Sequence, residues 1–232
     1  MLRRFFNLAA TMPLNDDFVY MPPQTPLHII YEDDDLVVVD KPAGLLSVPG
    51  RLPEHHDSAY FRVLEHYPQA KITHRLDMAT SGILMFAKHR EAEVAVSKMF
   101  QARAVTKQYT ALVQGKVCSA GEVNVPLIAD WDNRPRQMVD YALGKAAQTF
   151  YDVIAYDTEQ DISRMKLTPV TGRSHQLRVH MLHIGHPITG DKIYHPEPHK
   201  SPLQRMALHA THLAFLHPLS HRAICLDSAV PF

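Results

Sequence analysis

Residues 74–88 read HRLDMATSGILMFAK, and this is the most informative stretch of the chain. Its second half, GILMFAK, is a short apolar run that ends in a charge, which predicts a buried strand. The small polar residues before the run predict a turn. Arg75 and Asp77 precede that turn, so a rigid strand would present a guanidinium and a carboxylate from its entry loop. The alternative is that Asp77 only caps the turn, since short motifs also match by chance.

The pattern outside this stretch predicts many strands and few helices. Two apolar runs separated by the acidic turn EDDD predict a hairpin in residues 28–40. Recurring apolar residues predict helices at 57–67, 90–102 and 174–184, the last with Ser174 as N-cap. Further strands are expected at 106–114, 148–156, 163–170, 208–215 and 222–226, and surface loops at 131–135 and 196–202. Since strands and helices do not alternate regularly, the fold class is α+β with a mainly antiparallel sheet.

Composition narrows the class of protein. The chain of 232 residues is 46% hydrophobic and 21% charged, which is ordinary for a globular protein. No apolar run approaches the length of a membrane span. The 24 basic and 24 acidic residues give a formal net charge of zero. This argues against a strongly basic, non-specific nucleic-acid binder, although a local positive cleft can still bind phosphate in a neutral protein.

The cysteines and the N-terminus predict location and domain organisation. Cys118 and Cys225 lie far apart without paired-ligand spacing, and no secretory signal is evident, so we expect reduced thiols in a cytoplasmic protein. Residues 1–26 predict a flexible N-terminal tail; its basic start only weakly resembles a transit peptide. Residues 27–232 are then expected to form a single domain.

Six separated blocks carry a resemblance to a known family. In order, they are DKPAGLLSVPG (40–50), HRLD (74–77), KQY (107–109), PVTGRSHQLRVH (169–180), GHPITGD (185–191) and LHATHLAFLHP (208–218). Their order and spacing resemble the RluA-type pseudouridine synthases, from about residue 27 to the C-terminus. The resemblance implies a single pseudouridine-synthase catalytic domain, with a bent mixed sheet, flanking helices and a central cleft. Relatives with an additional S4 domain need far more chain at the N-terminus, so we expect no S4 domain here.

The resemblance also implies a reaction, the isomerisation of uridine to pseudouridine in RNA. The C1′–N1 glycosidic bond breaks, the uracil turns, and C1′ rejoins at C5. Asp77 would be the catalytic carboxylate, Tyr109 the ring that stacks on uracil, and Arg178 the cation that pairs with Asp77. Attack by Asp77 at C1′, its addition to C6, and its action as a base that yields a glycal all remain open. Tyr109, or a water that it holds, is the candidate base for the C5 proton.

Elementary chemistry is consistent with these implied roles but does not require them. A nucleophilic carboxylate must be ionised and held fixed, and a nearby cation keeps it ionised against desolvation. Without the resemblance, Arg178 would be interpreted as a surface charge on a helix and Tyr109 as a structural strand aromatic. His74 is expected to shape the Asp77 loop, and His175 and Gln176 to anchor the start of a helix.

Chemistry on a base requires that the nucleotide leave the stack, at a cost of about a few kcal/mol. By resemblance, Arg75 enters the gap that the uridine leaves; the alternative is a phosphate contact. Lys41, Arg173 and Lys192 lie in loops that contain glycine or proline, and by resemblance they contact the RNA backbone.

The resemblance to short members of the family implies two RNA targets, one uridine in the anticodon stem-loop of tRNA and one in a hairpin of 23S rRNA. It implies no cofactor, no metal and no membrane partner, and we expect a monomer.

Histidine spacing offers a second hypothesis, a metal-dependent hydrolase. His180 and His183 are three residues apart, as are His209 and His212, and two histidines at this spacing on a helix can share a metal. However, Pro187 should end the helix, and no HExxH-like motif supplies a base. A third hypothesis is an RNA-binding protein without catalysis, against which the complete set of Asp77, Tyr109 and Arg178 argues.

Overall fold

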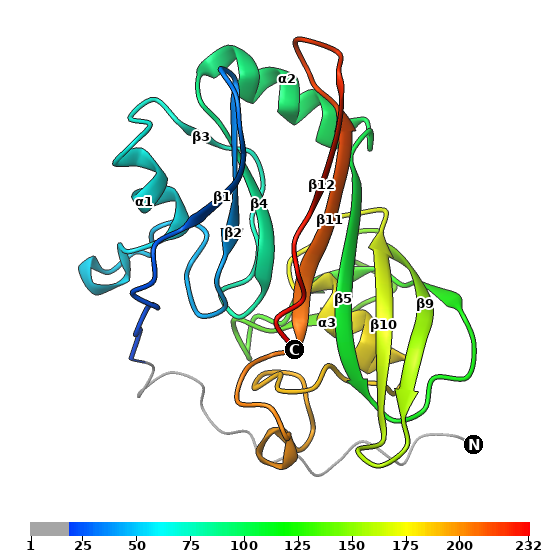
Figure 1. The fold of residues 1–232 in the computed structure, drawn as a ribbon. Helices are drawn as coiled ribbons and strands as arrows, with labels where there is room; N and C mark the ends of the chain where they lie inside the picture. Colours follow the sequence, from blue (N-terminus) through cyan, green and yellow to red (C-terminus); the bar gives the residue numbers. More distant parts are fainter. Residues whose placement is uncertain (1–18) are drawn as a thin grey trace.

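The structure is a computed structural model that describes residues 19–232 (Figure 1). Its largest element is a ten-stranded sheet in the order β1-β2-β4-β11-β5-β10-β9-β6, with β12 paired to β11 and β3 paired to β4. The strands of this sheet are β1 (His28–Glu32), β2 (Leu36–Lys41), β3 (Lys71–Ile72), β4 (Ser81–Ala87), β5 (Thr106–Gln114), β6 (Gly121–Asn124), β9 (Gln148–Asp157), β10 (Ile162–Pro169), β11 (Leu208–Leu216) and β12 (Ala223–Asp227). A separate hairpin pairs β7 (Leu127–Ala129) with β8 (Gln137–Val139).

The apolar run within residues 74–88 forms β4, which is buried along its whole length. Side chains alternate between the two faces of a strand, and here both faces are covered. Ile83 and Met85 pack in a core that also holds α2 (Arg90–Gln101), whereas Leu84 and Phe86 pack in a core that holds α1 (Ala59–Leu64). The predicted buried strand is therefore confirmed.

One parallel pairing lies beside the turn that carries Asp77. β4 and β11 pair in parallel only at Ser81 with His209 and Gly82 with Ala210, while the other pairings of the sheet are antiparallel. Beyond this contact the two strands separate, and α2 spans the upper ends of the two halves (Figure 1). At Gly82 the backbone has φ of +109°, and a Cβ there would lie 2.3 Å from the carbonyl oxygen of Ala210. The close approach of the strands thus requires glycine.

Each of the three predicted helices is present, but α1 (Ala59–Leu64) is shorter than the predicted 57–67 and the third helix starts later than predicted. The N-cap of α1 is Ser58, whose Oγ accepts from the backbone N–H of Phe61. The third helix, α3 (Gln176–His183), begins two residues later than expected, because its N-cap is His175 in a left-handed conformation rather than Ser174. Leu177 and Met181 of α3 pack with β5 and β10 in a third core.

Other differences lie in short elements. The sequence pattern did not predict β3, β6, β7 or β8, which have two to four residues each and too little periodicity to detect. A single 3-10 turn (Pro198–Lys200) lies within the predicted loop 196–202. Of the expected tail, residues 1–18 lie outside the described residues, but Tyr20 is buried and donates a hydrogen bond to the carbonyl oxygen of Asp57. In residues 19–232, no helix is long and apolar enough to cross a membrane.

Candidate active site

Asp77 lies in the turn that leads into β4, where its carbonyl oxygen accepts from the backbone N–H of Thr80 at 3.1 Å. The preceding residue is fixed because Ser47 Oγ donates to the carbonyl oxygen of Leu76 at 2.6 Å and accepts from its N–H at 3.0 Å. The Asp77 side chain is 25% exposed, which leaves it accessible to a substrate. The local fold therefore presents a fixed but reachable carboxylate.

Lys41 secures the other side of this turn. Its ammonium donates to the carbonyl oxygens of Met78, Leu45 and Pro42 at 3.1, 2.7 and 3.0 Å, and the residue is 0% exposed. Burial lowers the pKa of Lys41 to about 7, partly offset by the charge of Asp77. The prediction that Lys41 contacts the RNA backbone was wrong: the side chain is enclosed and its donors are used within the protein.

Arg178 makes the expected contact with Asp77 and a stronger one with a second carboxylate. Its Nη1 lies 3.1 Å from Asp77 Oδ2, while its Nε and Nη2 donate to the two oxygens of Asp191 at 2.7 and 2.8 Å. The side chains of Arg178 and Asp191 are 4% and 0% exposed. Burial alone would lower the pKa of Arg178, but the two carboxylates outweigh it and hold that pKa above its usual range.

Asp191 is a site residue that the sequence reasoning did not assign. It also accepts from the backbone N–H groups of Ile193 and Tyr194, at 2.9 and 3.1 Å. Although burial raises the pKa of Asp191, its bonds to Arg178 and these N–H groups lower it overall. The sequence signal for this residue was its place at the end of the block GHPITGD. The buried Arg178 needs charge compensation, and Asp77, whose side chain is 25% exposed, supplies only part of it.

Tyr109 lies on β5 and lines the same cavity as Asp77 and Arg178. Burial and the neighbouring Asp77 charge raise the pKa of its phenol well above the usual range. The side chain therefore stays a neutral phenol, with a ring suited to stacking and an O–H that can hold a water. Asp77, Tyr109 and Arg178, the three residues that the resemblance implied, therefore line one cavity.

His175 lies closer to the chemistry than its predicted anchoring role implied. Its Nδ1 is 2.7 Å from the hydroxyl of Tyr194, and that hydroxyl accepts from the N–H of Gln137 at 2.6 Å. The other ring nitrogen of His175, Nε2, lies 3.9 Å from Asp77 Oδ2. Burial lowers the pKa of His175, which favours its neutral form.

The left-handed backbone of His175, with φ of +53°, is uncommon for a residue other than glycine. Such strain persists where the surroundings fix it, often at functional sites. Gln176 supplies that support, as predicted for a residue that anchors the helix. Its side-chain amide forms hydrogen bonds with Thr171, Arg173 and the β9 residues Gln148 and Thr149.

His74 shapes the Asp77 loop, also as predicted, by accepting from the N–H of Met85 at 3.1 Å.

A groove of about 1000 Å³ opens over these residues. Its basic lining consists of Arg75, Arg103, Lys107 and Arg173. A local positive cleft therefore exists within a chain of zero formal net charge. Arg75 and Arg173 are exposed on its walls, whereas Lys192 is exposed but lies outside the residues that line it.

The histidines of α3 do not form a metal site. His180 is 0% exposed and its Nδ1 lies 2.9 Å from Thr149 Oγ1. Within residues 19–232, two groups of side chains bring three metal-ligating atoms together, and neither includes His180 or His183. The geometry gives the hydrolase hypothesis no support.

Comparison with known proteins decides the family. Residues 35–183 match the family model described as RNA pseudouridylate synthase. The chain belongs to this family. It is 51% identical over 215 residues to the dual-specificity RNA pseudouridine synthase RluA of Escherichia coli (strain K12), which covers 92% of this chain and 98% of that protein. It is 50% identical to the protein of the same name from Vibrio vulnificus (strain CMCP6), over 87% of this chain and 83% of the relative.

The fold agrees with the sequence match. The solved structure of human RNA Pseudouridylate Synthase Domain Containing 1 superimposes with a TM-score of 0.75 at 28% identity, over 91% of this chain and 87% of that one. The protein is thus an RNA pseudouridine synthase, an enzyme that isomerises uridines in RNA. The resemblance drawn from the six sequence blocks is confirmed, and the hydrolase and non-catalytic hypotheses are set aside.

Proposed function

We propose that this synthase modifies one uridine in the anticodon stem-loop of tRNA and one in a hairpin of 23S rRNA. The dual-specificity names of relatives about half identical over most of the chain support two RNA classes. The observation that carries the catalytic part is that Asp77, Tyr109 and Arg178, from three separate elements, meet in one cavity.

Asp77 is the catalytic carboxylate in this proposal. Arg178 pairs with it from 3.1 Å away, and the bonds of Lys41 and Ser47 hold its turn. Among the described residues, the close contacts of the carboxylate all involve Oδ2, which leaves Oδ1 for the substrate. Whether Asp77 attacks C1′, adds to C6 or removes a proton, the requirement is the same: an ionised oxygen fixed beside the uridine.

Tyr109 stacks on the uracil and keeps it near Asp77 after the glycosidic bond breaks. Because its phenol remains neutral, we assign the C5 proton to a water that its hydroxyl holds rather than to a phenolate. Rotation of the detached base requires a site that retains uracil without clamping it, and a flat ring meets that requirement.

The groove binds the RNA around the flipped uridine. Arg75, two residues before Asp77 and exposed on the groove wall, fills the gap left in the stack. Arg173 and Lys192 contact phosphates, the first on the groove wall and the second beyond it. Since the basic residues cluster at one groove, recognition depends on loop shape and unstacked bases more than on distant phosphates. We also propose that the protein acts as a monomer, because one chain supplies Asp77, Tyr109 and Arg178, and that it acts in the cytoplasm.

Short RNAs test this proposal. An isolated anticodon stem-loop and an isolated 23S rRNA hairpin should each gain pseudouridine at one position. The anticodon stem-loop should react nearly as fast as full-length tRNA. Stem-loops with the target uridine replaced by cytidine serve as controls and should not react. If only full-length tRNA or intact ribosomal subunits react, contacts beyond the groove are required and the compact-recognition argument fails.

A further inference from the structure

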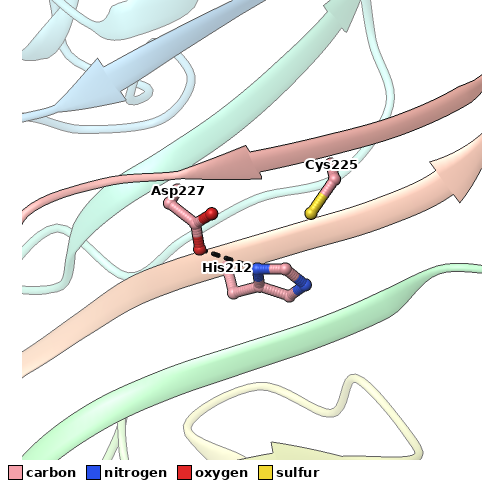
Figure 2. A group of neighbouring side chains, drawn as sticks. All are labelled: His212, Cys225 and Asp227. Carbon is pink, nitrogen blue, oxygen red and sulfur yellow. Dashed lines mark hydrogen bonds and ion pairs between the residues drawn. The ribbon is translucent and has the colours of Figure 1, made fainter.

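A cluster of unlike donor atoms lies on the β11–β12 ladder, away from the catalytic groove. His212 pairs with Asp227 across the ladder, and Cys225 precedes Asp227 by two residues, so the three side chains share one face of the strands. Figure 2 shows the thiol and the carboxylate gathered around the imidazole. One ligand atom from each residue lies within 4.8 Å of the others. None of the three lines the catalytic groove.

The strands beneath this cluster fix its geometry. Leu213 and Phe215, which alternate with His212 along β11, are buried in the core below α2. The residue opposite Cys225 is Ala214, so no large side chain stands across from the thiol. A ligand set on paired, packed strands is preorganised, because binding need not order the backbone.

The donors suit one class of metal ion. We propose that His212, Cys225 and Asp227 form a binding site for Zn²⁺, with water as the fourth ligand. Imidazole, thiolate and carboxylate are the three protein ligands that zinc uses, whereas a thiolate disfavours Mg²⁺ and Ca²⁺. Asp227 is 74% exposed on its side chain, which gives a water access to the open position.

Binding exchanges one set of bonds for another. In the structure, His212 Nδ1 lies 2.7 Å from Asp227 Oδ1. Zn²⁺ replaces this contact with a bond to each of the three side chains, and the Cys225 thiol releases its proton to solvent. The ion then links β12 to β11 and stabilises the native state, because a ligand that binds only the folded protein raises the free energy of unfolding.

In the second group of three donors, Asp33, Asp35 and His217, both carboxylates already have protein partners. Asp33 accepts from the Tyr31 hydroxyl and from two backbone N–H groups, and Asp35 pairs with His89 at 2.9 Å. His217 Nδ1 accepts from the N–H groups of Leu219 and Ser220, and its buried Nε2 makes no hydrogen bond although it lies 3.1 Å from Asp33 Oδ2. By contrast, Cys225 is a free, exposed cysteine, and its sulfur makes no hydrogen bond within residues 19–232.

The test is a metal titration of the untagged full-length protein after chelator treatment. Co²⁺ is added first, because a cobalt–thiolate bond gives a charge-transfer absorption band, and Zn²⁺ is then added to displace it. The wild type should show the band at one equivalent of Co²⁺ and lose it with Zn²⁺. Cys118→Ala is the matched control, since Cys118 is the other exposed free cysteine; this variant should behave as the wild type.

Cys225→Ala should lose the band and bind Zn²⁺ at least about tenfold more weakly, since even indirect support of a metal ligand is worth that much. Zn²⁺ should raise the Tm of the wild type and of Cys118→Ala but not that of Cys225→Ala. Cys225 is exposed, so the alanine variant should fold. Absence of the band in the wild type, or an unchanged band and Tm response in Cys225→Ala, would overturn the proposal.

Discussion

Asp191→Asn should destabilise the synthase far more than removal of the catalytic carboxylate. Asp191 is fully buried and holds two of the guanidinium nitrogens of Arg178, so its neutralisation leaves a buried cation with only Asp77, 3.1 Å away and partly hydrated. Breaking a buried ion pair from one side costs about 3–5 kcal/mol. Asp77→Asn leaves the Asp191 pair intact and should cost about 1 kcal/mol or less.

Urea unfolding followed by circular dichroism measures both losses. A double variant, Arg178→Met with Asp191→Leu, removes both charges and should recover most of the stability, because apolar replacement of a whole buried pair is often neutral. It should remain inactive, since Asp77 then lacks its cation. Asp191 is not the main charge partner of Arg178 if Asp191→Asn loses no more stability than Asp77→Asn, or if the double variant is less stable than Asp191→Asn.

Three further predictions concern the ring, the buried histidine and metals. Tyr109→Phe should lower kcat by about a hundredfold with little change in RNA affinity; full turnover in a rapid-quench assay would limit Tyr109 to stacking. Burial lowers the pKa of His180 from 6.5 to about 4. As the pH falls, this histidine therefore gains its proton first in the unfolded chain, and the free energy of unfolding falls by up to about 3 kcal/mol between these two pH values. His180→Gln should remove that part of the acid sensitivity in urea titrations at pH 7 and pH 4.5. Turnover should survive EDTA, and a loss restored by Zn²⁺ would implicate a metal in the reaction.

The central strand and its turn were predictable because their sequence signal is local. An apolar run of strand length, entered through small polar residues, leaves few alternatives to a buried strand, and β4 is that strand. The regular helices and long strands also followed from periodicity. Short strands such as β6 and β7 were missed because their stability comes from neighbours far away in the sequence.

The partners of charged groups were harder to predict than the groups themselves. The pairing of Arg178 with Asp77 is present, but the stronger partner is Asp191, thirteen residues further along the chain and placed by a loop with no periodic pattern. Lys41 was expected to be exposed because lysines usually are. Three carbonyl oxygens converge on it, and tertiary packing alone creates that arrangement.

His175 was assigned only a structural role for a related reason. Its proximity to Asp77 depends on a left-handed backbone conformation and on the contact of its Nδ1 with the hydroxyl of Tyr194. Neither feature has a sequence signature at this position. The residue types were therefore informative about the reaction, whereas the geometry that tunes them had to come from the fold.

The catalytic role of Asp77 is tested most directly by the turnover of Asp77→Asn on RNA that carries tritium at C5 of uridine. The tritium is released when C1′ rejoins at C5. Asparagine preserves the shape of the side chain but not its charge. We expect no tritium release above background, with RNA binding by gel shift and unfolding by urea close to those of the wild type. Release near the wild-type rate would contradict this expectation and remove Asp77 from the chemistry.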